Sequence, residues 1–421
     1  MKSDTIEKKI IYIIGLLIML PILTYRGLEW GIIILVVFMG FTIIKTKKIN
    51  NNSIFLILFI CSVATILILY VSSLEQKWKI AGTKGFIYFF IITIFCLTAK
   101  YLLNQEKKTY FIKGIKCGCI IQLIWSGIQY FSYSLLKIDI NNLIFFKLLN
   151  ITNTTSRISS ISNTIQVSGM GWHPALLVPI LVLSYLLFDN VYIKILLLVV
   201  ATITRNSTCM FAIILCFFLE YVVLKNRKKT KSLTKKTIFI AIISSIIFLT
   251  ILYINRNIFS IVSESVDNLF KRLNMVFTND VTDLSTSYHS RYYTFLPYII
   301  SNSKGYNVLF GYGYECSGYP FTHFLNQYSN YNAWIAESDP INFIIGRGII
   351  WTIIYYYWLI KNAIKGYKIS NKYGIFFTSI ILCGILYNNQ FLWVMIIEVF
   401  FAYCISKNID IFSLNSKTNT N

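Results

Sequence analysis

Charged residues are scarce in this chain. They make up 13 % of its 421 residues, and the acidic ones are the minority, with 17 Asp and Glu against 39 Lys and Arg. Soluble domains carry about 25 % charged residues, whereas this chain is 56 % hydrophobic. The composition therefore excludes an ordinary soluble protein and indicates a chain that folds in a lipid bilayer.

Several motifs of common enzyme chemistry are missing as well. The sequence has three histidines and contains no His-x-x-x-His, no Asp-x-Asp and no calcium-loop spacing, so it offers no recognisable metal site. Glycine motifs that bind nucleotide phosphates are also missing, which argues against a nucleotide-sugar transferase and against an ATP-driven pump. We therefore expect neither a metal nor another cofactor.

The nine cysteines do not form an evident disulfide framework. Only Cys316 lies in a long polar segment, and the others lie within hydrophobic runs. Cys117 and Cys119 are two residues apart, which places them on different faces of a helix and makes a poor metal site. We interpret the cysteines as small buried hydrophobic residues.

The net charge of +22 is distributed as in a membrane protein. Lysines gather in short connections between hydrophobic runs, and no basic groove interleaved with aromatic residues is visible, so we expect no nucleic-acid partner. One cluster occurs in every second connection, which is the pattern of positively charged cytoplasmic loops. The clusters lie at 45–48, 100–108, 225–236 and 361–372.

Hydrophobic segments predict an all-α polytopic membrane protein with about twelve transmembrane helices, folded as one integral membrane domain over 1–421. The first segment has no small-residue cleavage site after it, so we interpret it as a retained helix rather than a signal peptide. The predicted spans are 10–25, 29–44, 53–71, 84–103, 115–136, 173–189, 191–204, 207–224, 237–255, 340–360, 374–388 and 391–406.

The lysine clusters orient these spans. With a cytoplasmic N-terminus, about 25 of the Lys and Arg residues fall on the inner side and about 13 on the outer side, as the positive-inside rule requires. Both termini are then cytoplasmic. Two long segments, 137–172 and 256–339, lie on the outer side, and so do all three histidines, His173, His289 and His323.

The larger outer segment has a pattern of its own. Apolar residues recur at helical spacing over 258–277 with charged residues between them, which predicts an amphipathic helix on the membrane surface. A second short helix is predicted at about 287–300, and the glycines at 311 and 313 mark a turn. In the smaller outer segment, Pro174 suits the first turn of a helix.

Three arginines near the outer boundary are candidates for binding a phosphate. Arg205 lies in the turn between two spans, Arg291 lies in the large loop, and Arg347 lies about five residues inside a span. A guanidinium group is always charged and donates paired hydrogen bonds that fit phosphate oxygens. The structural alternatives are that Arg205 only caps its turn, and that Arg347 extends to the surface or pairs with a buried acid.

Acidic and histidine side chains are the candidates for proton transfer. Glu337 and Asp339 precede a span, where either could remove a proton from an attacking hydroxyl, although Asp339 before Pro340 also fits a helix cap. His289 and His323 are less specific alternatives. Glu398, within the last span, is expected to make a hydrogen bond or ion pair in the bundle.

Tyrosines are dense in the large outer segment. Tyr312 and its neighbours could stack on sugar rings or form an aromatic belt at the membrane interface.

Taken together, these motifs resemble those of the bacterial O-antigen and capsular polysaccharide polymerase family (Wzy-type), which belongs with the O-antigen ligases. The turn Thr204–Ser207 resembles the family's Ser-Arg-type turn. Arg291, followed about twenty residues later by Val308–Gly313, is similar to the family's glycine-containing loop segment. The stretch Glu337–Asn342, leading into Gly346-Arg347-Gly348, resembles the end of the family's large loop.

The resemblance implies a GT-C-like, inverting, metal-independent membrane glycosyltransferase in the bacterial cytoplasmic membrane. It would join polyprenyl-diphosphate-linked oligosaccharides on the outer leaflet into O-antigen or capsule, with a flippase and a chain-length regulator as partners. Arg205 and Arg291 would bind the diphosphate, and Glu337, or less directly a histidine, would activate the acceptor hydroxyl. Ligases of the superfamily have a histidine near the end of this loop, where this sequence has Glu337 and Asp339.

Two alternatives remain open at this point. One is a ligase that moves a finished glycan to a lipid or protein acceptor. The other is a flippase or secondary transporter, which would need internally repeated halves and charge along a central cavity. Neither repeated halves nor many polar residues in the middle of the spans are visible in the sequence.

Overall fold

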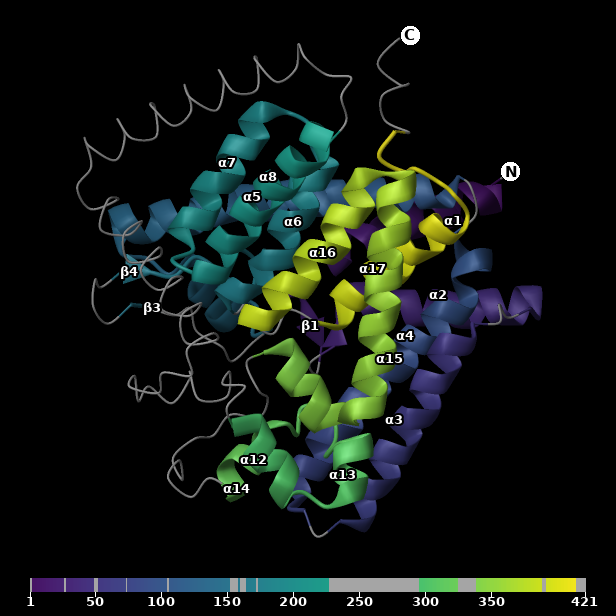
Figure 1. Cartoon of the computed structure of the whole chain (residues 1–421). Helices are drawn as coiled ribbons and strands as arrows, with labels where there is room; N and C mark the ends of the chain where they lie inside the picture. The colour runs from purple at the N-terminus through teal and green to yellow at the C-terminus, as the bar shows by residue number, and fades with distance from the viewer. Residues whose placement is uncertain are drawn as a thin grey trace. The chain divides into compact units, whose positions relative to one another are not determined.

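The computed structural model describes residues 2–25, 28–48, 52–72, 74–103, 106–151, 158–159, 164–171, 173–226, 295–324, 338–387 and 391–413. Within these ranges the chain is predominantly helical, and its only strands are two antiparallel pairs of two residues each (Figure 1). Residues 1–10, 32–110 and 272–421 form a first compact unit, and residues 11–31 and 111–271 form a second.

Four helices are long and apolar enough to cross a bilayer: α3 (Ser53–Val71), α4 (Gln76–Leu102), α5 (Lys107–Leu136) and α15 (Asp339–Ile369). Shorter helices include α1 (Lys2–Ile18), α2 (Trp30–Thr46), α6 (Leu177–Leu187), α7 (Val191–Ile203), α8 (Ser207–Asn226), α16 (Asn371–Leu386) and α17 (Leu392–Ser406). Eleven predicted spans thus overlap helices among the described residues, and the span 237–255 lies outside them. The helices are compatible with an all-α membrane protein.

The boundaries differ from the expected ones in a consistent direction. Helix α4 begins eight residues before the predicted span and α5 also begins eight residues early, because polar and lysine-containing turns continue each helix beyond its apolar run. Helix α1 also begins eight residues early, at Lys2, but it ends at Ile18, seven residues before the predicted end and shortly before Pro21, a residue that has no backbone N–H to continue a helix.

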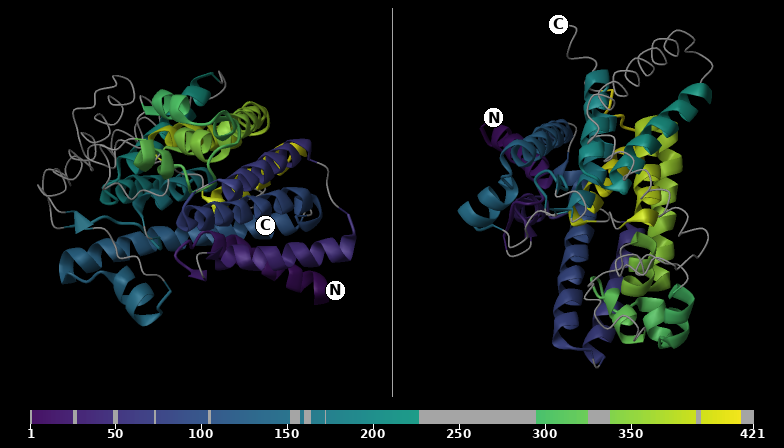
Figure 2. Two further views of the ribbon diagram at one scale, coloured as in Figure 1. Left: turned by 90° about the horizontal axis from the view of Figure 1, so that it is seen from below. Right: turned by 90° about the vertical axis from the view of Figure 1, so that its left-hand side faces the viewer.

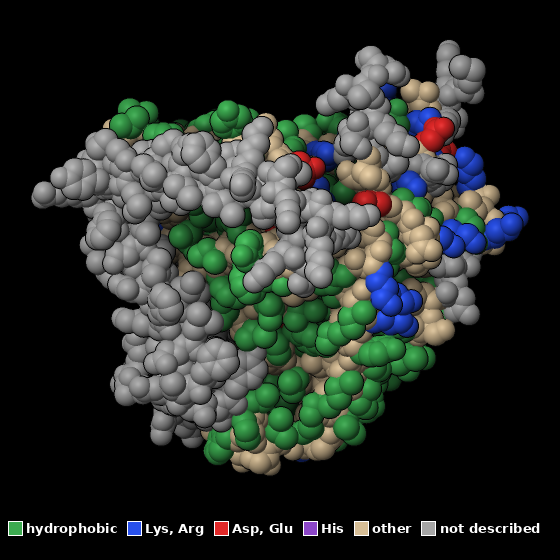
Figure 3. All heavy atoms as spheres, turned by 45° about the horizontal axis from the view of Figure 1, so that its top comes forward, with side chains coloured by type: hydrophobic (Ala, Val, Ile, Leu, Met, Phe, Trp, Pro, Cys, Tyr) green, Lys and Arg blue, Asp and Glu red, His purple; other side chains and the backbone are tan. Residues whose placement is uncertain are grey.

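The faces of α3 show the polarity expected in lipid. Its exposed side chains include Ile60, Leu67 and Val71, which are all apolar, whereas its buried face carries Ser62 and Thr65. A helix in water would place these residues the other way round. Hydrophobic side chains also predominate on the face shown in Figure 3, where the visible charged side chains lie in a few groups.

In the first unit, α3 and α4 pack side by side, and so do α15 and α16 (Figures 1 and 2). The core between α3, α4 and α15 is aromatic. Phe89 packs edge-on against Trp351 at 5.3 Å between ring centroids, and Trp351 stacks on Tyr355 at 4.8 Å. Association in lipid depends on such close packing rather than on removing apolar surface from water.

Helix α15 contains a sharp break. Gly348 has φ 85° and ψ 164°, which separates a short segment, Asp339–Arg347, from the long segment after it. Ser338 is the N-cap residue and Asp339 is the first residue of the helix, so the expectation that Asp339 caps this helix is wrong by one position. Pro340 fits because the first-turn N–H groups have no partner within the helix.

Two glycine pairs, Gly311 and Gly313 before the break and Gly346 and Gly348 at it, dock against each other. Gly313 donates its N–H to the carbonyl of Gly346 at 2.8 Å. A Cβ at Gly311 would lie 2.4 Å from the Gly346 carbonyl oxygen, and one at Gly348 would lie 2.2 Å from that of Leu309. The segment that the sequence suggested as a turn of a water-facing loop is therefore built into the core of the first unit.

Three short helices complete the described part of the predicted large outer loop: α12 (Phe295–Asn302), α13 (Gly305–Phe310) and α14 (Gly318–Phe324). Helix α12 covers the end of the short helix expected at 287–300. The amphipathic helix expected at 258–277 lies outside the described residues.

The second unit is built from α5, α6, α7 and α8, with the 3₁₀ turn Pro174–Leu176 before α6. Helices α1 and α5 approach closely at glycines, since a Cβ at Gly15 would lie 2.4 Å from the Phe111 carbonyl oxygen and one at Gly114 would lie 2.1 Å from that of Tyr12. Small residues at such crossings are typical of helices that pack in membranes.

The end of the smaller predicted outer segment is buried in this unit. Before it come the π-helix Asn142–Leu148 and the paired strands β3 (Ile158–Ser159) and β4 (Thr164–Ile165). The side chain of Gln122, in the middle of α5, accepts from the N–H of Met170 at 2.8 Å and donates to the carbonyl of Met19. Ser168 is held by Gln129 in the same way, at 3.0 Å. Buried backbone that is not helical is stable here because the amide side chains of Gln122 and Gln129 form hydrogen bonds with its N–H and carbonyl groups.

Candidate functional site

The structure distributes the predicted site residues over both units. Arg205 lies in the second unit, and Tyr312, His323, Asp339 and Arg347 lie in the first. The remaining three, His289, Arg291 and Glu337, lie outside the described residues, so their proposed roles stay predictions.

Arg205 occupies a tight turn between α7 and α8. Its φ of 51° is in the left-handed region that is rare for a side-chain-bearing residue, and its N–H donates to the Thr202 carbonyl at 3.1 Å. The side chain of Asn206 accepts from the N–H of Thr208 at 2.9 Å and so caps the start of α8. The polar turn that the sequence placed here is therefore present, with Arg205 half-buried in it.

Two hydroxyl groups beside Arg205 are buried without a hydrogen-bond partner among the described residues. They belong to Ser207, which is 2 % exposed, and Thr208, which is fully buried. Both stand in the first turn of α8, where backbone N–H groups and the helix dipole favour a negative charge. Arg205 is thus followed directly in the chain by two buried hydroxyls and a helix N-terminus, which makes this turn the candidate for binding an anion.

His173 lies close to this turn along another segment. It is the N-cap of the 3₁₀ turn, where its Nδ1 accepts from the N–H of Ala175 at 3.1 Å, so Nδ1 carries no proton there. The Cys209 thiol donates to the Pro174 carbonyl at 3.4 Å, which fixes the start of this turn beside the start of α8. The sequence predicted His173 on the outer side, but it gave no sign that the turn at His173 lies beside the start of α8.

Arg347 is enclosed by aromatic rings in the first unit. It is 5 % exposed, and its guanidinium carbon lies 4.0 Å from the ring centroid of Trp351, 4.2 Å from that of Tyr314 and 4.9 Å from that of Phe343. It does not extend to the surface, so that structural alternative is wrong, whereas the carboxylates of Asp339 and Glu315 lie close enough to interact with its charge. Gly346 and Gly348, on either side of Arg347, leave room for the backbone of Gly313 and Leu309.

Asp339 and Glu398 are both buried in the first unit. Asp339 is 1 % exposed, and its Oδ2 would lie 2.4 Å from a Cβ at Gly384. Glu398 is fully buried and accepts a 2.5 Å hydrogen bond from the hydroxyl of Tyr355, which confirms the contact expected for it. Asp339 therefore stands inside the helical bundle rather than in a water-facing loop.

Tyr312 and His323 have different surroundings. Tyr312 is 6 % exposed, and its hydroxyl donates to Ser303 at 2.9 Å, so its ring is core rather than a free stacking platform. His323 is exposed and its ring stacks on Tyr319 at 5.0 Å. His323 is thus the more accessible of the two for a substrate.

Glu315 is a half-buried acid near Arg347 that the sequence did not single out. Glu315 has a φ of 60° and lies 3.9 Å from Lys84. Burial raises the pKa of Glu315 above its usual value, and the Lys84 ammonium offsets part of this rise. Elsewhere in the described ranges, no three His, Cys, Asp or Glu residues are grouped as a metal site would require.

Compared with known proteins, the chain matches no protein-family model and no curated sequence. The resemblance carried by its motifs therefore remains a hypothesis, and a function for this chain has to be argued from its own residues and their geometry.

Proposed function

We propose that this protein is a polysaccharide polymerase that transfers a glycan between polyprenyl-diphosphate-linked oligosaccharides on the outer leaflet of the cytoplasmic membrane. The observation that carries the proposal is the turn at Arg205. Its unpartnered hydroxyls and helix N-terminus suit the oxygens of a diphosphate, which is the leaving group of this reaction.

The chemistry needs little more than charge stabilisation and a base. Negative charge develops on the diphosphate as its bond to the sugar breaks, and a fixed guanidinium with N–H and O–H donors stabilises that charge. An acceptor hydroxyl must lose a proton at the same stage. Glu337 is our proposed base, with His323 and Asp339 as the alternatives that the sequence offers.

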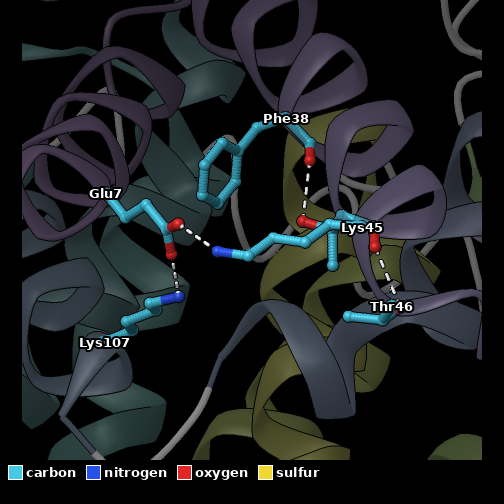
Figure 4. Close-up of polar contacts among 6 residues, drawn as sticks. Glu7, Phe38, Lys45, Thr46 and Lys107 are labelled. Carbon is cyan, nitrogen blue, oxygen red and sulfur yellow. Dashed lines mark hydrogen bonds and ion pairs between the residues drawn. The ribbon is translucent and has the colours of Figure 1, made fainter. Parts of the chain in front are cut away.

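Contacts in the first unit join segments that the sequence predicts to lie on the same side of the membrane. Glu7, in α1, lies between Lys45 at the end of α2 and Lys107 at the start of α5 (Figure 4). All three belong to segments predicted to be cytoplasmic. By contrast, Glu315 pairs with Lys84, and the Cys316 thiol donates to the Trp78 carbonyl at 3.0 Å, which joins segments predicted on the outer side.

Transport of a lipid-linked oligosaccharide is the second candidate, and one observation favours it. Arg347, Asp339 and Glu398 are all buried in the same unit, and ionisable groups inside a helical bundle are typical of transport pathways. A ligase has no comparable observation in its favour among the described residues.

The test is deletion of the gene followed by complementation, with the cell-surface glycan separated on a gel. We expect deletion to leave single repeat units and no long polymer. Arg205→Ala should restore little or no polymer, since removing one donor to a developing charge lowers kcat by about 10²-fold or more, and Arg205→Lys should restore part of it. Lys77→Ala is the matched control, because Lys77 is an exposed cation on the predicted outer side.

Each other outcome has a defined meaning. Loss of single units as well as polymer on deletion would indicate the transporter. A normal ladder with Arg205→Ala, in protein that reaches the membrane at the normal level, would contradict the proposed diphosphate site.

A further inference from the structure

The last part of α15 carries three lysines on one side, which we call the lysine face: Lys361, Lys365 and Lys368. They follow one another at intervals of four and three residues, the spacing that places side chains on the same side of a helix. Lys365 and Lys368 are exposed, and Lys361 is half-buried. Because a helix rises by about 1.5 Å per residue, the three lysines line about 10 Å of helix surface.

The same side of α15 is apolar before the lysines. Tyr357 and Ile353 stand four and eight residues before Lys361, and both are exposed. The Lys361 ammonium lies 5.6 Å from the centroid of the Tyr357 ring. Tyrosine is enriched where a bilayer meets water, so a change from apolar to basic side chains at this ring indicates the level of the lipid headgroups. The lysine clusters of the sequence predict that this end of α15 is cytoplasmic.

No described acid pairs with the lysine face. The stretch 340–397 contains no Asp or Glu, and none of the ion pairs within 4.0 Å among the described residues includes these lysines. Helix α15 packs against α3, α13, α16 and α17. The first three contain no acid, and the acid of α17, Glu398, is fully buried. The described helices around α15 therefore leave an excess of positive charge on this face.

A structural role at the helix end explains only part of this arrangement. The helix dipole stabilises a cation near the C-terminus, but the effect is confined to about the last turn. Lys368 stands in that turn, whereas Lys361 and Lys365 precede it. The dipole therefore does not account for the lysine face as a whole.

The backbone that carries the lysine face is held by packing. Ser370 donates its N–H to the Gly366 carbonyl at 2.9 Å, where α15 ends. Helix α16 then returns close to α15, since a Cβ at Gly366 would lie 2.9 Å from that of Tyr373, which is fully buried. Binding at a face on a packed helix needs less ordering of the chain than binding at a mobile tail, and less ordering favours affinity.

We propose that the lysine face binds the headgroup phosphate of an anionic phospholipid in the cytoplasmic leaflet. The ammonium groups donate charge-assisted hydrogen bonds to the phosphate oxygens, and an acyl chain lies along the apolar side at Tyr357 and Ile353. Lysines next to a membrane helix favour anionic lipids over zwitterionic ones, because each adds to the attraction. This site is predicted on the opposite side of the membrane from Arg205, and it does not depend on the proposed diphosphate site.

The test uses the purified full-length protein in detergent, with added phosphatidylglycerol or phosphatidylethanolamine of the same acyl chains, so that only the headgroup differs. We expect an unfolding midpoint about 2 °C or more higher with phosphatidylglycerol, since a ligand that binds the folded state stabilises it. Lys365→Gln with Lys368→Gln should remove most of this difference. The matched control is Lys77→Gln with Lys304→Gln, which replaces two exposed lysines predicted on the outer side and should retain it.

Native mass spectrometry would count the bound lipid directly. The variant with both lysine-face substitutions should bind phosphatidylglycerol about tenfold or more weakly than the wild type, and the control variant should bind it equally well. Raising the salt concentration to about 0.5 M should weaken binding to the wild type, because exposed charges are screened.

Three results would overturn the proposal. Equal midpoints with the two lipids would show that the headgroup charge does not matter. Equal losses in both double variants would show that the lysine face is not the site. An equal response to inorganic phosphate or to an acidic peptide would assign the face to a free anion or to a protein partner. None of these readouts uses glycan synthesis, so the proposed function could fail while this site stands, or the reverse.

Discussion

At the scale of single residues, Glu7 and Glu315 show that the pKa of a glutamate shifts in opposite directions in different environments. Glu7 accepts from the ammonium groups of Lys107 and Lys45, and these contacts lower its pKa below the usual value of 4.5 (Figure 4). Glu315 is shifted the other way, because burial outweighs the attraction of Lys84 and raises its pKa. Both lie outside the predicted spans, so their titration should be measurable in the folded protein.

We expect Glu7→Gln and Glu315→Gln to change the free energy of unfolding in opposite directions at pH 7. Glu7 stabilises the fold above pH 4.5 and loses this effect as the pH falls through its lowered pKa, so its replacement should cost about 1 kcal/mol. Glu315 favours the fold only while it is protonated, and its contribution is lost as the pH rises through its raised pKa. Its replacement should therefore raise the unfolding midpoint at pH 7.

Thermal unfolding of the two variants and the wild type between about pH 3.5 and pH 8 would check this pair, each variant acting as the other's control. The Glu7 difference should shrink as the pH falls below 4.5 towards its lowered pKa, whereas the Glu315 difference should already shrink as the pH falls through its raised pKa towards 4.5. Shifts of the same sign at pH 7 would contradict the assigned environments.

At the scale of elements, the break in α15 determines what surrounds Arg347. A helix that continued straight through Gly348 could not accept the backbone of Leu309 and Gly311 at this distance. The two glycine pairs look unremarkable in the sequence, as turn or packing residues. Their docking depends on segments that are far apart in the chain, so local pattern could not reveal it.

Gly348→Ala should strongly destabilise the protein, by about 3 kcal/mol or more. The substituted residue would need a φ of 85° and would place its Cβ 2.2 Å from the Leu309 carbonyl oxygen. Gly40→Ala is the matched control, because Gly40 lies inside α2 and a Cβ there meets nothing within 4 Å. That control should be neutral or stabilise by up to about 1 kcal/mol.

Thermal unfolding in detergent and yield in the membrane fraction would measure both variants. Equal midpoints for Gly348→Ala and the wild type would show that the break and the docked segment are not needed for stability.

At the scale of the whole molecule, the contacts within the first unit pair predicted inner segments with inner ones. Tyr373, near the start of α16, donates to the Ile409 carbonyl beyond the end of α17 at 2.9 Å, as Glu7 pairs with Lys45 and Lys107. These contacts are expected if the joined segments lie on the same side of the membrane, and the lysine distribution predicts that this side is the cytoplasmic one.

We therefore predict that reporters placed after Lys48 and after Lys407 are cytoplasmic, whereas reporters after Glu75 and after Ser303 lie on the outer side. Fusions to a fluorescent protein that matures only in the cytoplasm and to a phosphatase active only outside it would report each position with opposite signals. An outer signal at Lys48 or an inner one at Ser303 would reverse the topology and remove the diphosphate site from the outer leaflet.

The sequence alone predicted an all-α membrane protein, with which the structure is compatible, and it located most of the helices that the structure describes. Long apolar runs and lysine clusters are local features, and helices in lipid must form from continuous segments because their backbone groups have no water to bind. The polar turn at Arg205 and the hydrogen bond of Glu398 could also be predicted from the sequence, because a polar residue stands out within an apolar run. The described residues contain helices where eleven of the spans were expected.

Tertiary structure decided how the site residues are surrounded. Whether Arg347 reached the surface or was enclosed by aromatic rings depended on Tyr314 and Phe89, which approach it from other parts of the chain. The same holds for the unpartnered hydroxyls of Ser207 and Thr208, whose burial follows from packing within the second unit. Burial and hydrogen-bond satisfaction are properties of the packed chain, so a pattern along the sequence identified the charged residues but not their environments.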